Sequence, residues 1–189
     1  REEIVKKLER DNEIQANVLE VLVTVGAIEG LSAAVMAIID PGDEVIVPAL
    51  TWGTTLWPVS QMGLIPVLVD CDDSLNMDVS EVSKAITDNT KAIFVAHILG
   101  KSPEMDILMR IAIDNDIVLI EDACESLGTE YQGRKVGTVG EMGSYSFYFS
   151  HNITTIEGGM IVTESDRTAD LLRCLRAHGW TRHMKDRSI

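Results

Sequence analysis

Asp122 is the residue whose type and position most directly suggest chemistry. It comes at the end of an apolar run that begins at Ile117, and the small residues after it predict a turn, so its carboxylate lies at a strand tip. A carboxylate in that place can keep a pyridinium nitrogen protonated, which is how proteins tune a pyridoxal ring as an electron sink. For an isolated aspartate, capping the start of a following helix is the simpler explanation.

Two turns could bind a planar, phosphorylated ligand. The segment Thr24–Gly30 runs from a predicted strand into a predicted helix, and at Gly26 and Ala27 it offers free backbone N–H groups and the positive end of a helix dipole to a phosphate. Trp52 follows another predicted strand and could offer an aromatic face to a ring. Either feature alone is common, because tight turns often use glycine and a tryptophan after a buried strand is usually core.

Short apolar runs alternate with helical stretches along the chain. The expected strands are Val21–Val25, Glu44–Val47, Ile65–Asp70, Lys91–His97, Ile117–Glu121, Tyr145–Phe149 and Met160–Thr163. The expected helices are Glu2–Ile14, Ile28–Ile39, Thr54–Met62, Ser80–Thr87, Pro103–Asn115 and Arg167–Ala177. Continuous Val/Ile/Leu runs are typical of strands covered on both faces. The alternation predicts an α/β fold with a mostly parallel, doubly wound sheet of about seven strands and helices on both faces.

The predicted sheet would bring distant polar residues together. In doubly wound sheets, ligands bind beyond the carboxyl ends of the strands. Asp122, Ser146, His151 and the turn around Gly26 all fall at such ends. We therefore expect these residues to share one crevice.

Composition and charge limit the partners. The chain has 189 residues, of which 46% are hydrophobic, and this is enough for the core of one α/β domain. Thirty acidic residues against 16 basic ones give a formal charge of -14, which argues against general nucleic-acid binding. No apolar run approaches the ~20 residues that span a bilayer, and Arg1–Glu3 is not a secretory signal, so no membrane partner and a cytoplasmic location are expected.

The cysteines do not indicate a metal or disulfide framework. Cys71, Cys124 and Cys174 are odd in number and widely spaced. This pattern predicts buried, reduced thiols and no metal site.

Five short segments stand in a characteristic order: Pro41–Val45, Thr51–Trp52, His97–Gly100 with Met105–Asp106, Glu121–Ser126 and Ile153–Gly159. From about Asp40 to Arg182 they resemble the sugar aminotransferase and dehydratase family of pyridoxal-phosphate enzymes, which have the aspartate-aminotransferase fold (fold type I). The resemblance implies that residues 1–189 form the large, cofactor-binding domain of that fold. It also implies a longer protein whose smaller C-terminal domain is absent here.

The resemblance gives roles to the residues at the strand ends. The implied cofactor-binding residues are Gly26, Ala27, Trp52, Asp122, Glu125 and Ser146. Trp52 would stack on the ring, Asp122 would pair with the pyridine nitrogen, Ser146 would bind the phosphate, and Glu125 would lie beside the ring substituents. Because Ala27 lacks a hydroxyl, the first helix turn would offer only backbone N–H groups to the phosphate.

His151 is the departure from the family pattern. Members that transfer an amino group carry a lysine there, which forms a Schiff base that an imidazole cannot form. Ser150 before His151, together with Cys174–Arg182, resembles the subfamily of GDP-4-keto-6-deoxy-mannose 3-dehydratases, in which the histidine is the catalytic base and the cofactor is held without a covalent bond. An imidazole, whose ordinary pKa lies near ~6.5, suits such proton transfer.

That subfamily implies the reaction and the partners. Glutamate would convert pyridoxal 5'-phosphate to the pyridoxamine form, which would then act on the 4-keto group of a nucleotide-linked 6-deoxyhexose and release its C3 hydroxyl. The resemblance also implies a homodimer. A branch that deoxygenates CDP-sugars with an iron–sulfur cluster also uses a histidine here, but Ser150 and the segment His178–Arg182 favour the cluster-free branch.

Three further polar residues have weaker assignments. By resemblance, Arg182 would bind a carboxylate of glutamate, which suits its forked donor, although a solvated arginine in a basic tail is the alternative. His178 could contact the sugar, but a lone histidine in a loop is more often structural. His97 is predicted to be structural and to bond backbone groups in the turn after its strand.

Three hypotheses of different kinds therefore remain. The chain is a lysine-free dehydratase, an aminotransferase homologue inactivated at His151, or a non-catalytic fragment that binds only a cofactor or a partner subunit. A lysine able to reach the cofactor would favour the second hypothesis, and a crevice without cofactor affinity would favour the third.

Overall fold

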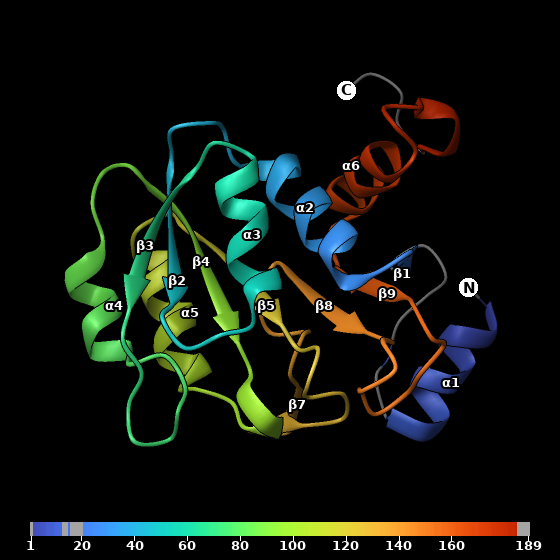
Figure 1. Ribbon diagram of the computed structural model, residues 1–189, viewed down its shortest axis with the longest axis horizontal. Helices are drawn as coiled ribbons and strands as arrows, with labels where there is room; N and C mark the ends of the chain where they lie inside the picture. Colours follow the sequence, from blue (N-terminus) through green and yellow to red (C-terminus); the bar gives the residue numbers. More distant parts are fainter. Residues whose placement is uncertain (1, 13–14, 16–20, 185–189) are drawn as a thin grey trace.

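Seven strands form the main sheet of the computed structural model, which describes residues 2–12, 15 and 21–184. They are β1 (Val21–Thr24), β2 (Glu44–Pro48), β3 (Ile65–Val69), β4 (Thr90–Ala96), β5 (Val118–Asp122), β8 (Met142–Ser146) and β9 (Gly159–Val162). Their order is β1-β9-β8-β5-β4-β2-β3 (Figure 1). Within this described sheet β9 is antiparallel to both neighbours, and the other neighbouring pairs are parallel. The predicted α/β fold with a mostly parallel sheet is confirmed.

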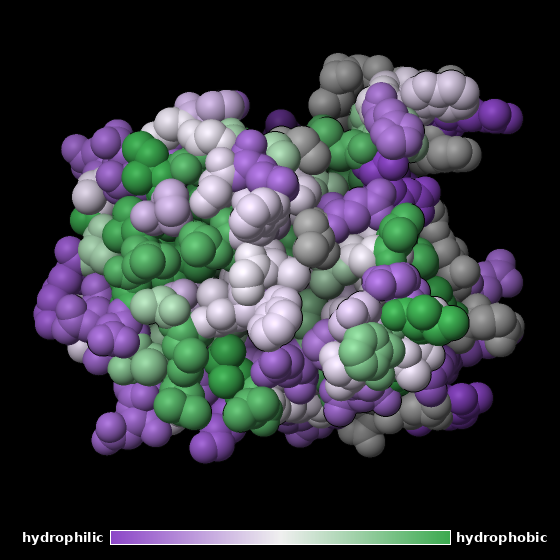
Figure 2. All heavy atoms as spheres, in the orientation of Figure 1, coloured by the Kyte–Doolittle hydropathy of each residue, from purple (hydrophilic) through white to green (hydrophobic). Residues whose placement is uncertain are grey.

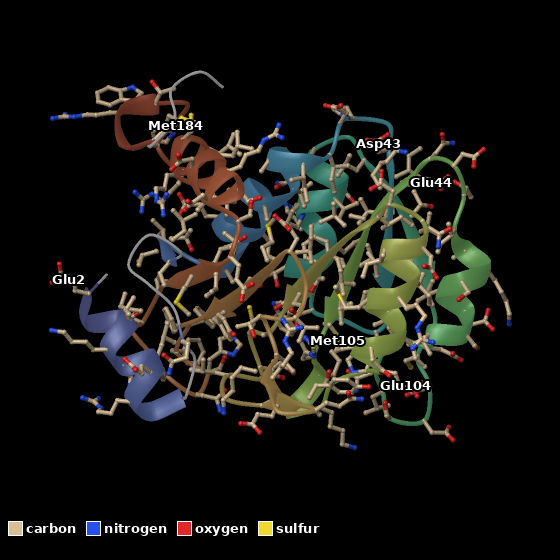
Figure 3. All side chains as sticks on the ribbon, turned by 180° about the vertical axis from the view of Figure 1, so that it is seen from behind. Glu2, Asp43, Glu44, Glu104, Met105 and Met184 are labelled. Carbon is tan, nitrogen blue, oxygen red and sulfur yellow. The ribbon has the colours of Figure 1, made fainter. Side chains whose placement is uncertain are left out.

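Helices cover both faces of this sheet, as predicted. They are α1 (Glu2–Asn12), α2 (Ala27–Ile38), α3 (Gly53–Gln61), α4 (Val79–Ala85), α5 (Met105–Asp114) and α6 (Asp166–Arg176). The helices α2, α3 and α6 pack on one face, and α1, α4 and α5 pack on the other. Figure 3 shows the second face, with α5 beginning at Met105. The predicted end of the first helix at Ile14 lies outside the described residues.

Alternation along the central strands fixes the two faces. On β5, Ile120 packs with Phe94 in the cluster under α2, α3 and α6, whereas Leu119 packs with Leu108 of α5 on the other face. Ile120, Phe94 and Leu108 are fully buried. Because burying each such side chain contributes about 1.5–3 kcal/mol, the core holds the end of β5, and therefore Asp122, in a fixed place. None of the described helices is long and apolar enough to cross a membrane.

The prediction for β8 was wrong by three residues. The strand was expected over Tyr145–Phe149, but it spans Met142–Ser146. Its first residues pair with β5, Met142 with Ile120 and Gly143 with Glu121. Gly143 also lies so close to the backbone of Gly137 that no side chain would fit between them. It ends early because the chain turns after Ser146. Ser146 therefore ends the strand, at the edge of the sheet where ligands bind.

A small hairpin was not predicted. It joins β6 (Glu130–Tyr131) to β7 (Arg134–Lys135), and its turn residues Gln132 and Gly133 have φ angles of 49° and 79°. Glycine adopts such a φ without strain, so a glycine after a polar residue was the signal that could have revealed the turn.

The edge strand β3 exposes part of its apolar surface. Ile65 and Leu68 are 50% and 58% exposed. Apolar side chains gather on this side of the molecule, over β2 and β3 (Figure 2). Pro66 lacks an N–H group, which suits a strand that pairs on one side only.

Candidate functional site

The carboxyl ends of β4, β5 and β8 meet the N termini of α2 and α3 around a cavity of 640 Å³. The predicted residues that line it are Gly26, Ala27, Trp52, Asp122, Glu125, Ser146 and His151. The structure thus brings together the catalytic residue and all the cofactor-binding residues predicted from the sequence. The shared crevice expected from the strand ends is present.

Asp122 lies at the tip of β5 with its carboxylate held on both oxygens. The Oδ2 atom accepts a hydrogen bond from Thr55 Oγ1 at 2.8 Å, and Oδ1 accepts one from the backbone N–H of Cys124 at 3.1 Å. No helix follows in the next residues, so the alternative of a helix cap is wrong. The Cys124 thiol also hydrogen-bonds this carboxylate, which still keeps acceptor capacity for a donor inside the cavity.

Glu121, one residue earlier, points to the opposite face and is fully buried. It accepts hydrogen bonds from the backbone N–H groups of Gly137 (2.7 Å), Val139 (2.7 Å) and Gly140 (2.6 Å), and its Oε2 lies 2.9 Å from His97 Nε2. His97 is therefore structural, as predicted, but its ring bonds this carboxylate rather than the backbone. Glu121, the acidic residue directly before Asp122, was a signal for this partner of His97 that the sequence analysis did not use.

The first turn of α2 offers backbone N–H groups to the cavity. Gly26 occupies the N-cap position in an extended conformation with φ of −159°, and no side chain caps this helix end. A Cβ atom on Gly159 would lie 2.5 Å from the carbonyl carbon of Gly26, so only glycine lets β9 approach this turn. Ser146 adds a hydroxyl at the end of β8 and is 8% exposed. This combination suits a phosphate group.

Trp52 is 75% exposed and stands at the N-cap of α3, on the wall of the cavity. The alternative of a core tryptophan is therefore wrong. An exposed indole at this place can present its face to a planar ring.

His151 lies on a loop after β8. The loop is fixed at its base, because Phe147 N–H donates to Gly158 O and Thr155 N–H donates to Phe147 O, both at 2.9 Å. The backbone N–H of His151 donates to Tyr148 O at 3.0 Å, and its half-exposed imidazole makes no hydrogen bond or ion pair with a described residue. The backbone hydrogen bond thus holds His151 in the loop, and its imidazole remains available to a ligand.

The charged residues on the cavity wall are mostly acidic. Asp122, Glu125 and Glu157 line it, and among the described residues no lysine or arginine does. Glu125 accepts a hydrogen bond from Leu99 N–H at 2.9 Å, which holds a turn where Leu99 has φ of 51°. The described part of the wall therefore has no amine that could bond covalently to a carbonyl.

The three cysteines are free, as predicted, but each is half-buried rather than buried. Burial, followed by the negative charge of Asp122, raises the pKa of the Cys124 thiol well above its ordinary value. A protonated thiol is a poor nucleophile and a poor metal ligand. No cluster suited to a metal ion occurs among the residues that the structure describes.

His178 and Arg182 are not among the residues that line the cavity. Both are exposed and follow α6, and Arg182 lines a separate hollow with Gly179. The helix α6 packs against α2, and the chain after it leads to this second hollow. Their contact with a substrate stays a prediction from the resemblance.

Residues 3–189 match the DegT/DnrJ/EryC1/StrS aminotransferase family. The chain belongs to this family. A GDP-4-keto-6-deoxy-D-mannose 3-dehydratase of Yersinia pseudotuberculosis is 44% identical over 146 residues, which are 77% of this chain and 37% of that protein. A GDP-perosamine synthase of Caulobacter vibrioides is 42% identical over 142 residues, which are 75% of this chain and 38% of that protein.

A solved structure shows the same fold. The E. coli GDP-4-keto-6-deoxy-D-mannose-3-dehydratase with bound hydrated PLP has a TM-score of 0.86 at 35% identity, with 96% of this chain and 48% of that chain covered. This chain therefore has the fold of the pyridoxal-phosphate-dependent aminotransferases. The chain spans less than half the length of each of these three relatives.

Proposed function

We propose that this chain forms the cofactor-binding part of a pyridoxal-phosphate-dependent 3-dehydratase. The substrate would be a nucleotide-linked 4-keto-6-deoxyhexose, glutamate would be the amino donor, and the cofactor would be held without a covalent bond. The observation that carries the proposal is the composition of the cavity wall. The imidazole of His151 lines it, and no lysine among the described residues does. The similar dehydratases support the choice of reaction.

The residues present fit the cofactor. Asp122 lines the cavity and keeps acceptor capacity for a protonated ring nitrogen, and Trp52 offers a flat face. The backbone N–H groups at the start of α2 and the hydroxyl of Ser146 would hold the phosphate. Glu125 would lie beside the ring substituents, as the resemblance implies.

When bound, the cofactor supplies an amine that condenses with the 4-keto carbon and a ring that accepts an electron pair. His151 would take the proton from cofactor atom C4' and could return it to the departing C3 hydroxyl, because imidazole exchanges protons near neutral pH. Asp122 would favour that proton loss by holding the ring nitrogen protonated. His178 and Arg182 would meet the sugar and the glutamate carboxylate.

A homodimer and a cytoplasmic location are part of this proposal. Phe149 on the cavity wall and Ile156, next to the wall residue Glu157, are 65% and 79% exposed, which suits a surface covered by a second subunit. A second subunit could also bring the basic groups that the described wall lacks, since the substrate and cofactor carry several phosphates. The sedimentation coefficient of the purified chain tests this part.

An inactivated aminotransferase is the second candidate, because the similarity to a GDP-perosamine synthase is almost as high. Transfer of an amino group needs a lysine at the position of His151. The described wall has no other lysine that could replace it, so amino transfer is disfavoured, and the resemblance of Ser150–His151 to the dehydratases favours the first candidate.

The test is the absorbance of pyridoxal 5'-phosphate with the purified chain and glutamate. We expect saturable binding and conversion of the aldehyde form to the amine form, and we expect His151→Asn to slow the conversion at least about 100-fold while binding persists. The control is Thr163→Val, which changes a buried residue outside the cavity wall. If the parent chain binds no cofactor, the third hypothesis, a non-catalytic fragment, replaces this proposal.

A further inference from the structure

Two threonine hydroxyls form a chain that ends on Asp122. Thr55 lies in the first turn of α3, is fully buried, and donates from Oγ1 to Asp122 Oδ2 at 2.8 Å, across 67 positions of sequence. Thr51 Oγ1 lies 2.7 Å from Thr55 Oγ1. Both threonines line the cavity, yet neither is among the residues that sequence reasoning assigned to the site.

The direction of the chain follows from the number of protons. An ionised carboxylate can only accept, so the single hydroxyl proton of Thr55 points to Asp122. The oxygen of Thr55 is then left as an acceptor, and the proton between the two hydroxyls belongs to Thr51. The order is therefore Thr51 to Thr55 to Asp122, and such chains strengthen each hydrogen bond by mutual polarisation.

This chain fixes the orientation of the carboxylate. The other oxygen of Asp122 accepts from the backbone N–H of Cys124 at 3.1 Å, and the Cys124 thiol also hydrogen-bonds this carboxylate. Rotation of the carboxylate would break these bonds. Its remaining acceptor capacity is consequently held in a fixed direction at the edge of the cavity.

We propose that Thr55 is a positioning residue that aims Asp122 at the ring nitrogen of the bound cofactor, and that Thr51 in turn orients Thr55. The inference rests on the proposed function, because it concerns the same site. It adds two residues from the start of α3 to the cofactor site and gives each a specific task.

The test separates the hydroxyl from the methyl group of Thr55. Thr55→Val keeps the shape and removes the hydroxyl, and Thr55→Ser keeps the hydroxyl and removes the methyl. Dissociation constants are measured for pyridoxal 5'-phosphate and for its analogue with carbon in place of the ring nitrogen. Thr163→Val is the control, since Thr163 is also buried and donates to Glu141 O at 2.7 Å outside the cavity wall.

We expect Thr55→Val to weaken binding of the natural cofactor about tenfold, Thr51→Val about threefold, and Thr55→Ser less than about twofold. Binding of the analogue should be unchanged in all of them, because it has no ring nitrogen. The control variant should bind both ligands like the parent.

Equal binding by Thr55→Val and the parent would overturn the inference and leave the proposed function standing. A loss shared by both ligands, or a larger loss in Thr55→Ser than in Thr55→Val, would also overturn it, because the role would then be packing. If the parent itself binds no pyridoxal 5'-phosphate, the proposed function fails and the inference falls with it.

Discussion

Glu121 and Asp122 are consecutive carboxylates at the end of β5, and the structure gives them opposite environments. Glu121 is fully buried and accepts from three backbone N–H groups as well as lying 2.9 Å from His97 Nε2. Asp122 is 6% exposed on the cavity side and accepts from Thr55 Oγ1 and from the backbone N–H and thiol of Cys124. The first carboxylate is saturated by the protein, whereas the second keeps acceptor capacity for a ligand.

The difference shows how one strand can serve both stability and binding. Glu121 ties the chain around Gly137 and Gly140 to the back of the sheet. This anchor holds the strand end on which Asp122 is displayed. Because neighbouring residues on a strand point to opposite faces, a shift by one residue would exchange the two roles.

The largest expected effect is on stability, from Glu121→Gln. The amide cannot accept on its nitrogen, so buried N–H donors lose their partner, and the free energy of unfolding should fall by about 3 kcal/mol. Urea titration measures this. Glu130→Gln is the control, because Glu130 is 47% exposed in its ion pair with Lys135 and should contribute less than about 1 kcal/mol. Equal losses of unfolding free energy in Glu121→Gln and Glu130→Gln would contradict the role of Glu121 as a buried anchor.

Asp122→Asn should lower the affinity for the cofactor and leave the free energy of unfolding almost unchanged. We expect stability to change by less than about 1 kcal/mol, since the amide oxygen can accept from the Cys124 N–H while the amide nitrogen donates to the Thr55 hydroxyl, which can turn to accept. Affinity for pyridoxal 5'-phosphate should fall about 10–100-fold with loss of the charged partner. Isothermal titration and urea unfolding on the same sample report both quantities. A variant as unstable as Glu121→Gln would show that Asp122 is structural.

Trp52→Ala should weaken cofactor binding about tenfold without altering stability, because the exposed indole contributes contact to the ring rather than to the core. The matched control is Trp57→Ala on the same helix, since Trp57 is 59% exposed and does not line the cavity. Fluorescence titration measures the affinity. Similar losses in both variants would mean that the site of stacking is wrongly assigned.

The smallest effect is a pH dependence that both carboxylates help to produce. Burial, followed by the charge of Asp122, raises the pKa of Cys124, and burial, followed by the charge of Glu121, raises the pKa of Tyr145. The folded chain then keeps protons that the unfolded chain releases above about pH 8.5 for the thiol and about pH 10 for the phenol. Stability is therefore full below these values and falls as the pH rises, by at most about 1.4 kcal/mol per pH unit and group.

Cys124→Ala should flatten the decline between about pH 8.5 and 10, as measured by urea titrations at stepped pH. The phenol decline above that window should remain in the variant. A parent whose stability does not decline in this window, or a variant with the same slope as the parent, would contradict the assignment.

The sequence was sufficient for the features that depend on local pattern. Apolar runs and glycine signals predicted the alternation of strands and helices, and this alternation placed Asp122 at the edge of the sheet where ligands bind. The predicted bounds Tyr145–Phe149 put Ser146 near the start of its strand, whereas the structure puts it at the end. The family resemblance then gave His151 its meaning. These steps need only the order of residues along the chain.

Contacts between distant segments could not be predicted in this way. Nothing near Asp122 in the sequence indicates the hydroxyl of Thr55, 67 positions away. The first residues of β8 pair with β5, and Gly143 lies against the backbone of Gly137; a strand pattern encodes neither contact. His97 was assigned to the backbone because its buried partner Glu121 lies on a different strand.

The central claim is that the cofactor is held beside His151 without a covalent bond. The most direct measurement is the intact mass of the chain after incubation with pyridoxal 5'-phosphate and borohydride, for the parent and for His151→Lys. We predict no stoichiometric mass gain in the parent, which should release its cofactor on dialysis, and a gain of one reduced cofactor in the variant. Stoichiometric labelling of a lysine in the parent would contradict the account.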